Sequence, residues 1–392
     1  MQALVATLLP NRGIADIAVA CWDAGEAIAP IPATAPAAEV AARLAALRPT
    51  HLVDQQGRHA LADGIPVDEG TAAVITTSGT AGAPKLVELT RSGMEVMGRG
   101  YSRAVGAGDR DRWLACMPLH HVASLAIVAR AYVCGLPFVV HDTFDLERVA
   151  RSHEPDGDHA TMVSLVPTAL HRLVESGAPI DRFRCLIIGG AVLPPGLRTR
   201  AEVLGARVVD AYGLTETWGG CAINGAANDG IELRLASNGE IEVRGAPVMR
   251  GYRFASDATN EVIDPDGWFR TGDVGEFVNG QLRVIDRIKD IVITGGVNVS
   301  PTQVEDVLID HPSIDDVTVV GVPDNEWGER VVAVVVVHSD VAAPSISELR
   351  DFARDRLSGP KLPRELRVVE TIPRSAGGKV LRRVVRDAIV AE

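Results

Sequence analysis

The sequence predicts an α/β protein in which a large N-terminal domain of layered sheets is followed by a smaller α+β domain. Short runs of β-branched residues alternate with stretches of helical periodicity, and this alternation is typical of largely parallel sheets covered by helices. Between residues 239 and 285 the pattern changes to short alternating strands separated by Gly and Asp turns. This change indicates a β-rich subdomain within the larger domain.

Each expected element follows from a local pattern. Short apolar runs predict buried strands at residues 72–75, 186–188, 208–211 and 317–320. Helical periodicity predicts helices at residues 37–47, 124–133, 196–204 and 302–309. In the subdomain, alternation predicts strands at residues 240–244 and 281–285.

A charged interruption at residues 286–290 predicts the boundary between two domains, residues 1–286 and residues 287–392. After it come a glycine turn, a helix, further strands and a C-terminal helix. Together these make about a hundred residues, which is enough for a small independent domain.

Composition and charge narrow the classes of protein. Of 392 residues, 46% are hydrophobic and 23% charged, as in ordinary soluble globular proteins. The net charge of −12 excludes a general attraction to nucleic acid or anionic membranes. The five cysteines form no Cys-x-x-Cys pair, and we find neither a signal peptide nor an apolar run that could span a bilayer. We therefore expect a cytoplasmic protein without membrane insertion or nucleic-acid partners, and a homo-oligomer is left open.

The most informative stretch is residues 76–85, which place several hydroxyl residues, two glycines and Lys85 directly after an expected strand. Glycines let a backbone approach a polyphosphate, hydroxyls and amide N–H groups donate to it, and lysine supplies charge. The spacing differs from that of the Walker-type loop. Taken alone, the stretch could equally be a flexible connector.

A second stretch, residues 210–217, follows another expected strand. Tyr212 offers an aromatic face on which a purine could stack. Thr215 offers a hydroxyl, and Glu216 offers a hard carboxylate oxygen suited to Mg²⁺. The alternative interpretation is a strand end followed by a capped helix.

Two further stretches have nucleoside-binding and purely structural interpretations. The strand that ends in Gly189-Gly190-Ala191 leaves a flat edge against which a planar base could lie, or it makes a tight turn. Asp273 could accept both hydroxyls of a ribose, or it could be an ordinary turn residue.

Near the C-terminus, Lys379 follows two glycines amid several arginines. Charge runs at such positions are usually solvated. A lysine on a glycine-rich turn could instead be inserted into a site.

Taken together, these stretches resemble the adenylate-forming superfamily of acyl-CoA synthetases, luciferases and nonribosomal-peptide adenylation domains. They occur in the family's order and with family-like spacing. The matching stretches are residues 77–85, 212–217, 271–273, 286–290 and 378–379. The resemblance covers roughly residue 72 to the C-terminus and implies the adenylate-forming fold, in which the small C-terminal domain is mobile.

Within that superfamily the chain looks most like the short o-succinylbenzoate–CoA ligases of menaquinone synthesis. Few residues precede the Thr-Ser-Gly-Thr loop, and residues 118–123, 164–167 and 216–221 are similar to runs in that group. One departure is at residues 295–298, where Gly-Gly-Val-Asn replaces the Gly-Gly-Glu-Asn of many relatives. This change puts details of the thiol channel in doubt, but not the adenylation chemistry.

The resemblance implies a two-step reaction with ATP, Mg²⁺ and CoA, in which a small carboxylic acid first becomes an acyl-adenylate. Lys379 would bridge the attacking carboxylate and the α-phosphate, Thr215 would bind the α-phosphate, and Glu216 would hold Mg²⁺. The residues that would bind the nucleotide are Thr77, Ser78, Gly79, Thr80, Lys85, Gly189, Gly190, Ala191, Asp210, Tyr212, Gly213, Asp273 and Arg287.

The second step implies that the small domain rotates about a hinge at Lys289. The acyl pocket is less well defined, and its candidates are His120, His121, Ser164, Thr168, Gly219 and Gly220. The histidine pair is either a neutral structural pair or part of the pocket. The second carboxylate of o-succinylbenzoate needs a polar or basic partner, because an unpaired buried charge is very costly.

Three other functions are left open. They are a CoA ligase for another aryl or medium-chain acid, a stand-alone adenylation enzyme that loads a carrier protein, and a non-catalytic nucleotide-binding regulator. Lys379, Glu216 and Asp273 argue against the regulator, because all three are present.

Overall fold

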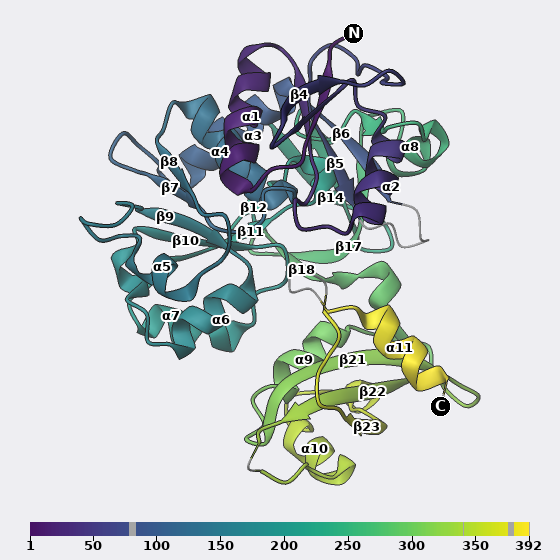
Figure 1. Cartoon of the computed structure of the whole chain (residues 1–392). Helices are drawn as coiled ribbons and strands as arrows, with labels where there is room; N and C mark the ends of the chain where they lie inside the picture. The colour runs from purple at the N-terminus through teal and green to yellow at the C-terminus, as the bar shows by residue number, and fades with distance from the viewer. Residues whose placement is uncertain (78–83, 340, 375–379, 392) are drawn as a thin grey trace.

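The computed structural model describes residues 1–77, 84–339, 341–374 and 380–391. In this part of the chain two seven-stranded sheets form the body of the molecule, a four-stranded sheet adjoins them, and a five-stranded sheet belongs to a C-terminal unit. Figure 1 shows the C-terminal unit below the body, next to β18 (Gln281–Arg287). The α/β fold class predicted from the sequence is confirmed.

The first sheet is parallel at its centre and antiparallel at its edges. Its strands in spatial order are β16 (Gly251–Tyr252), β6 (Lys85–Thr90), β5 (Thr71–Thr77), β2 (Ala27–Pro30), β1 (Leu4–Thr7), β3 (His51–Asp54) and β4 (Gly57–Ala60). β1 pairs in parallel with β2 and β3, whereas β6 is antiparallel to β5 and β16. The central strands are apolar and buried, because helices cover both faces.

The second sheet follows the same plan. Its strands in spatial order are β13 (Ala226–Ala227), β12 (Ala222–Ile223), β11 (Val208–Tyr212), β10 (Cys185–Gly189), β9 (Met162–Leu165), β7 (Trp113–Ala115) and β8 (Phe138–Val140). The pairs from β11 to β8 are parallel, and β12 and β13 are antiparallel. The carboxyl ends of β10 and β11 therefore lie side by side, which places the segments that follow them at one edge.

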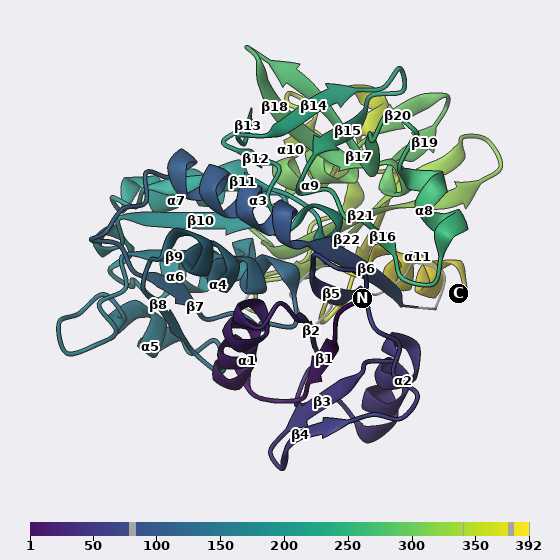
Figure 2. The ribbon, with the colours of Figure 1, turned by 90° about the horizontal axis from the view of Figure 1, so that it is seen from above.

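Helices form three layers around these two sheets (Figure 2). The layer between the sheets shares their core and contains α1 (Asn11–Asp23), α3 (Arg91–Ala104) and α4 (Val122–Cys134). The outer face of the first sheet is covered by α2 (Ala37–Leu47). The outer face of the second sheet is covered by α5 (Leu146–Arg151), α6 (Pro167–Glu175) and α7 (Pro195–Val203). Since α4 is buried on nearly all sides, it is mostly apolar, and Arg130 is its charged residue.

The β-rich subdomain is a four-stranded antiparallel sheet. It contains β14 (Ile231–Leu235), β15 (Glu240–Gly245), β17 (Phe269–Val278) and β18, with α8 (Ser256–Val262) beside it. The two strands predicted at residues 240–244 and 281–285 lie within β15 and β18. This sheet matters for the site because β17 and β18 carry two of the predicted nucleotide-binding residues.

The C-terminal unit has a sheet with helices on both faces. Its strands in spatial order are β20 (Val297–Val299), β19 (Val292–Thr294), β22 (Gly328–Val337) and β21 (Ile314–Asp324), with β23 (Glu365–Val368) also paired to β22. One face packs on α9 (Pro301–Leu308) and α10 (Ile346–Ala353), and the other on α11 (Arg382–Val390). Alternate valines of β21 serve the two cores, as the two-residue period of a strand requires.

The expected elements lie close to where the sequence placed them. Residues 72–75, 186–188 and 208–211 fall in β5, β10 and β11, and the four predicted helices match α2, α4, α7 and α9 within about two residues. The parallel arrangement holds at the centres of the two large sheets, whereas the C-terminal unit, expected to be α+β, is mostly antiparallel. Residues 317–320 belong to β21, which forms an antiparallel hairpin with β22. A run of valines indicates a buried strand in either kind of sheet, and only the short connection to β22 requires the antiparallel one.

Candidate active site

Tyr212, Asp273 and Arg287 meet in one polar cluster. The Tyr212 hydroxyl donates to Asp273 Oδ2 over 3.0 Å, and Arg287 Nε lies 3.2 Å from Asp273 Oδ1. Tyr212 ends β11, whereas Asp273 and Arg287 are paired residues of β17 and β18. The fold therefore brings together the residues for which the sequence predicted purine stacking and ribose binding.

The electrostatics of this cluster leave room for further hydrogen bonds. Burial raises the pKa of the Tyr212 phenol, and the Asp273 carboxylate raises it further, so the phenol stays a donor at neutral pH. The Asp273 side chain is only 8% exposed. A carboxylate oxygen can accept more than one hydrogen bond, which is the chemistry that binding a ribose diol requires.

The predicted flat edge lies next to Tyr212. Gly189 pairs with Ala211, and a Cβ on Gly189 would stand 3.0 Å from the Ala211 carbonyl oxygen. Gly190 has a φ of 82°, a conformation that favours glycine, and both Gly190 and Ala191 are exposed. A planar group stacked on Tyr212 would therefore meet backbone here, and no large side chain.

Asp210 and Gly213 have local structural roles. Asp210 Oδ2 lies 2.9 Å from Arg198 Nη2 on α7, so a nucleotide would have to compete with this ion pair. A Cβ on Gly213 would lie 2.3 Å from the Gly219 carbonyl carbon, because the loop folds back on itself. The direct nucleotide contacts suggested for both residues stay predictions.

A second polar group joins Lys85, Glu216 and Tyr252. The Tyr252 hydroxyl donates to Glu216 Oε1 over 2.9 Å. Lys85 Nζ lies 4.3 Å from the centroid of the Tyr252 ring, within cation–π range. Tyr252 was not predicted, because the sequence around it carries no phosphate-binding or metal-binding pattern.

The short helix η2 (Thr215–Thr217) holds Glu216 beside the first sheet. Trp218 is fully buried and its indole N–H donates to the Thr90 carbonyl over 2.9 Å. The Met249 N–H donates to the Glu216 carbonyl over 2.7 Å. These bonds fix the backbone that carries Thr215 and Glu216 against β6.

The structure describes the residues on either side of the predicted phosphate loop. Thr77 ends β5 and Lys85 begins β6, and the two are paired. Ser78, Gly79 and Thr80 lie outside the described residues. Their role stays a prediction.

Glu216 fits the requirement of a Mg²⁺ ion for a hard oxygen ligand. Oε1 accepts from Tyr252, and Oε2 has no hydrogen bond or ion pair among the described residues. No group of three His, Cys, Asp or Glu side chains gathers into a metal site in the same part of the chain. A Mg²⁺ here would be held by Glu216 with phosphate oxygens and water, the usual arrangement at nucleotide sites.

Lys379 lies outside the described residues, but the chain on either side is described. Arg374 and Val380 form an isolated antiparallel bridge. Beyond it, Arg382 Nη2 lies 2.6 Å from Oε2 of the half-buried Glu305 on α9. Both flanks of the predicted catalytic lysine are therefore tied to the C-terminal unit.

Three of the predicted acyl-pocket residues, His120, His121 and Gly219, lie around the start of α4. The His120 and His121 rings are 4.3 Å apart between centroids, and His121 is the N-cap of α4. A Cβ on Gly219 would lie 3.5 Å from Ala123 Cα, and one on Gly220 would also meet the inner helix layer. Burial lowers the pKa of His120 to about 3, and electrostatic repulsion from His121 is the next largest cause. The pair is therefore neutral at physiological pH, whether its role is structural or substrate-lining.

Ser164 leads to a residue that the sequence did not single out. Arg130 Nη2 donates to Ser164 Oγ over 3.4 Å, and the Arg130 guanidinium carbon lies 4.2 Å and 4.4 Å from the ring centroids of Tyr101 and Trp113. Arg130 is 2% exposed and its Nη1 is buried without a hydrogen-bond partner in the described part of the chain. Thr168, by contrast, is exposed on α6.

The charge on Arg130 has no counter-ion among the described residues. Burial lowers its pKa, but an arginine stays protonated in proteins, so a cation remains inside the helix layer. A buried cation without a carboxylate is costly and is a candidate for binding an anionic group. A single arginine within an apolar helix is the sequence signal that could have found it.

Lys289, the predicted hinge, lies in η3 (Ile288–Asp290) between β18 and β19. The segment after it is tied back to the body by Asp286, which is 5% exposed. Asp286 Oδ2 accepts from the Ser300 hydroxyl over 2.7 Å and from the Thr302 N–H over 3.0 Å, at the start of α9. The hinge and the domain boundary at residue 286 stay predictions.

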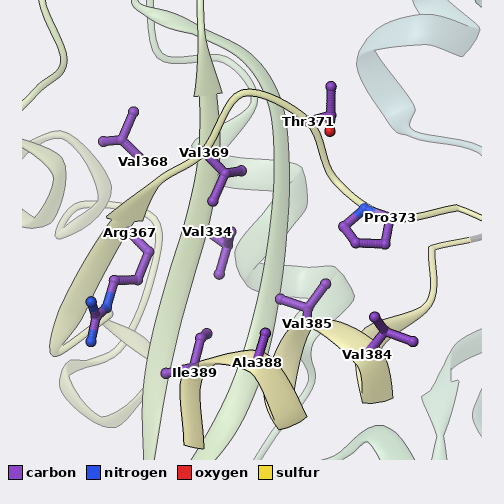
Figure 3. Close-up of a pocket in the computed structure, with 10 residues that line it drawn as sticks. All are labelled: Val334, Arg367, Val368, Val369, Thr371, Pro373, Val384, Val385, Ala388 and Ile389. Carbon is purple, nitrogen blue, oxygen red and sulfur yellow. The ribbon is translucent and has the colours of Figure 1, made fainter. Parts of the chain in front are cut away.

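A separate apolar pocket of about 260 Å³ lies between α11 and the strands β22 and β23 (Figure 3). In the close-up, Val385 and Ala388 of α11 face Val334 of β22. None of the described candidate site residues lines this pocket. Within the described residues no helix is long and apolar enough to cross a membrane.

Comparisons with known proteins extend this picture. Residues 59–253 match the model of AMP-binding enzymes, and residues 303–379 match that of the AMP-binding enzyme C-terminal domain. The chain is 34% identical over 346 residues to the 2-succinylbenzoate–CoA ligase of Bacillus licheniformis, which covers 82% of this chain and 70% of that protein.

Two solved structures share the fold along nearly the whole chain. The o-succinylbenzoate CoA synthetase of Bacillus subtilis, in complex with the acyl-adenylate intermediate OSB-AMP, is 28% identical with a TM-score of 0.85, over 98% of this chain and 88% of that one. It has also been solved with ATP and a magnesium ion. An amide bond synthetase from Marinactinospora thermotolerans is 27% identical with a TM-score of 0.86, over 99% and 90%.

Proposed function

The chain belongs to the adenylate-forming acid–CoA ligase family of AMP-binding enzymes, and within it we propose that the chain is an o-succinylbenzoate–CoA ligase. In the first step a substrate carboxylate attacks the α-phosphorus of ATP, so that an acyl-adenylate forms and pyrophosphate leaves. In the second step the CoA thiol attacks the acyl carbon, a thioester forms and AMP leaves.

The observation that supports this substrate is the uncompensated cation of Arg130. o-Succinylbenzoate carries two carboxylates, and only one of them reacts. Arg130 donates to Ser164 Oγ, which leaves the Ser164 hydroxyl hydrogen available to the non-reacting carboxylate, with the positive charge directly behind it. A fatty acid has no group that would use this charge.

The remaining residues act at the nucleotide. Asp273 and Arg287 would hold the ribose while Tyr212 stacks on the adenine, and Lys85 would approach the outer phosphates. A bound Mg²⁺ would neutralise phosphate charge. Lys379 would place its ammonium where the acid and the α-phosphate meet.

Release of AMP that depends on CoA tests the proposal. The full chain is supplied with o-succinylbenzoate, its analogue in which the ring carboxylate is replaced by hydrogen, benzoate and octanoate. We expect o-succinylbenzoate to exceed the mono-acid analogue about tenfold or more in kcat/KM, because a charge-assisted hydrogen bond is lost.

Equal use of the analogue would contradict the proposed substrate. Formation of acyl-adenylate without release of AMP on addition of CoA would contradict the proposed acceptor, and would favour a carrier protein or an amine in its place.

A further inference from the structure

The Tyr252 side chain contacts both Glu216 and Lys85. It lies on β16, where it pairs with Val87 of β6, and it is 6% exposed. Its N–H donates to Thr259 Oγ1 over 2.8 Å, which fixes its backbone to α8. Tyr252 is therefore a rigid support between the predicted metal ligand and the predicted phosphate-binding lysine.

The two contacts have different physical effects. A hydrogen bond to Glu216 Oε1 restricts rotation of the carboxylate and leaves its charge in place, because the phenol is neutral. Burial raises the pKa of Tyr252, and Glu216 raises it further, so the phenol remains a donor across the physiological range. The ring face attracts the ammonium of Lys85, but more weakly than a carboxylate would. A phosphate can therefore draw the ammonium away from the ring easily.

We propose that Tyr252 is a positioning residue for Mg·ATP, whose hydroxyl orients Glu216 toward the metal and whose ring guides Lys85 toward the phosphates. This inference rests on the adenylation proposed above and adds a residue that the sequence did not indicate. Partners that orient a metal ligand in this way typically contribute about tenfold to a hundredfold to metal affinity.

A matched control exists elsewhere in the chain. The Tyr132 hydroxyl donates to Asp23 Oδ1 over 2.8 Å, which is the same kind of bond between α4 and α1. Neither residue is a candidate for the site. Tyr132→Phe therefore measures what the loss of a tyrosine–carboxylate bond does to the protein in general.

The test is calorimetric titration of the full chain with ATP at a series of Mg²⁺ concentrations, without any acid. We expect Tyr252→Phe to need about tenfold more Mg²⁺ for half-maximal ATP binding, while its affinity for metal-free ATP stays unchanged. Tyr252→Leu should show the same Mg²⁺ shift and should also weaken metal-free ATP binding, because Lys85 loses its ring. Tyr132→Phe should match the wild type.

A wild-type Mg²⁺ dependence in Tyr252→Phe would overturn the inference, and so would an equal shift in Tyr132→Phe. Unfolding midpoints of all variants identify any that fail to fold, and Tyr252→Phe keeps the ring and its packing. The titration contains no acid, so its result does not depend on the acid substrate. If the chain binds Mg·ATP but never forms o-succinylbenzoyl-adenylate when the acid is supplied, the proposed function is refuted and the Tyr252 result stands. A wild type without ATP binding would refute both.

Discussion

The proposed nucleoside end and the proposed acyl end of the candidate site handle charge in opposite ways. At the nucleoside end, Asp273 is already paired with Arg287 and hydrogen-bonded to Tyr212. At the acyl end, Arg130 is buried against aromatic rings and forms no ion pair among the described residues. One end is electrostatically complete before any ligand binds, and the other is not.

The difference indicates that the nucleoside end binds the nucleotide and that the acyl end selects a particular acid. A paired carboxylate offers ordinary hydrogen bonds, which suits the neutral diol of a nucleotide. An unpaired buried cation selects for an anion, because only an anion relieves the cost of its burial. Substitutions at each end should therefore change the kinetics of different substrates.

The largest effect should come from Lys379, the predicted catalytic residue. Lys379→Ala should lower the rate of acyl-adenylate formation about a hundred- to a thousandfold, because it removes a charged donor positioned for the transition state. ATP–pyrophosphate exchange measures this step. Lys361→Ala, in the same unit, serves as the control. Near-normal exchange in Lys379→Ala would show that neither end depends on this lysine.

A smaller effect is expected at the nucleoside end. Asp273→Asn should raise the KM for ATP about ten- to hundredfold, because hydrogen bonds to a charged group are lost, while the KM for the acid stays nearly unchanged. Initial rates at varied ATP and varied acid separate the two constants. Asp266→Asn changes an exposed turn carboxylate and should leave both constants alone. A change confined to the KM for the acid would contradict the assignment of Asp273 to the nucleoside end.

At the acyl end the expected effect is smaller again. Ser164→Ala should raise the KM for o-succinylbenzoate about three- to tenfold, because one hydrogen bond is lost while Arg130 remains. The KM for the mono-acid analogue should not change. Thr199→Ala is the control, because the Thr199 hydroxyl donates to the Pro195 carbonyl of its own helix. If both acids respond equally, Ser164 has no part in reading the second carboxylate.

The smallest effect concerns stability at mildly acidic pH. The pKa of His120 falls from an ordinary 6.5 to about 3 in the folded chain. Between these values the unfolded chain binds a proton that the folded chain does not, so stability is lost as the pH falls below about 6.5. His120→Gln should therefore lose less Tm than the wild type between pH 7 and pH 5.

The sequence predicted the nucleoside end better than the acyl end. Tyr212, Asp273 and Arg287 lie in runs with a recognisable composition, and the fold brings them within hydrogen-bond and ion-pair distance. Arg130 was missed because it is a single residue in an apolar helix, and its meaning depends on which rings surround it. Tyr252 was missed for a similar reason, since its partners lie 36 and more residues away.

The topology shows the same limit. Periodicity located the strands, but it did not distinguish the parallel centres of the two large sheets from the antiparallel hairpin of β21 and β22. Pairing direction depends on the length of the connection between strands, and a valine-rich run is the same in both cases.

The hydrogen bonds of Asp286 bear on how the C-terminal unit could move. Its carboxylate spans from β18 to the first residues of α9 and so bypasses the proposed pivot at Lys289. A rotation about that pivot must therefore detach Ser300 and Thr302 from Asp286 or carry this carboxylate along. In either case these two hydrogen bonds, beside the predicted ribose-binding residue Arg287, would favour one orientation of the C-terminal unit over another.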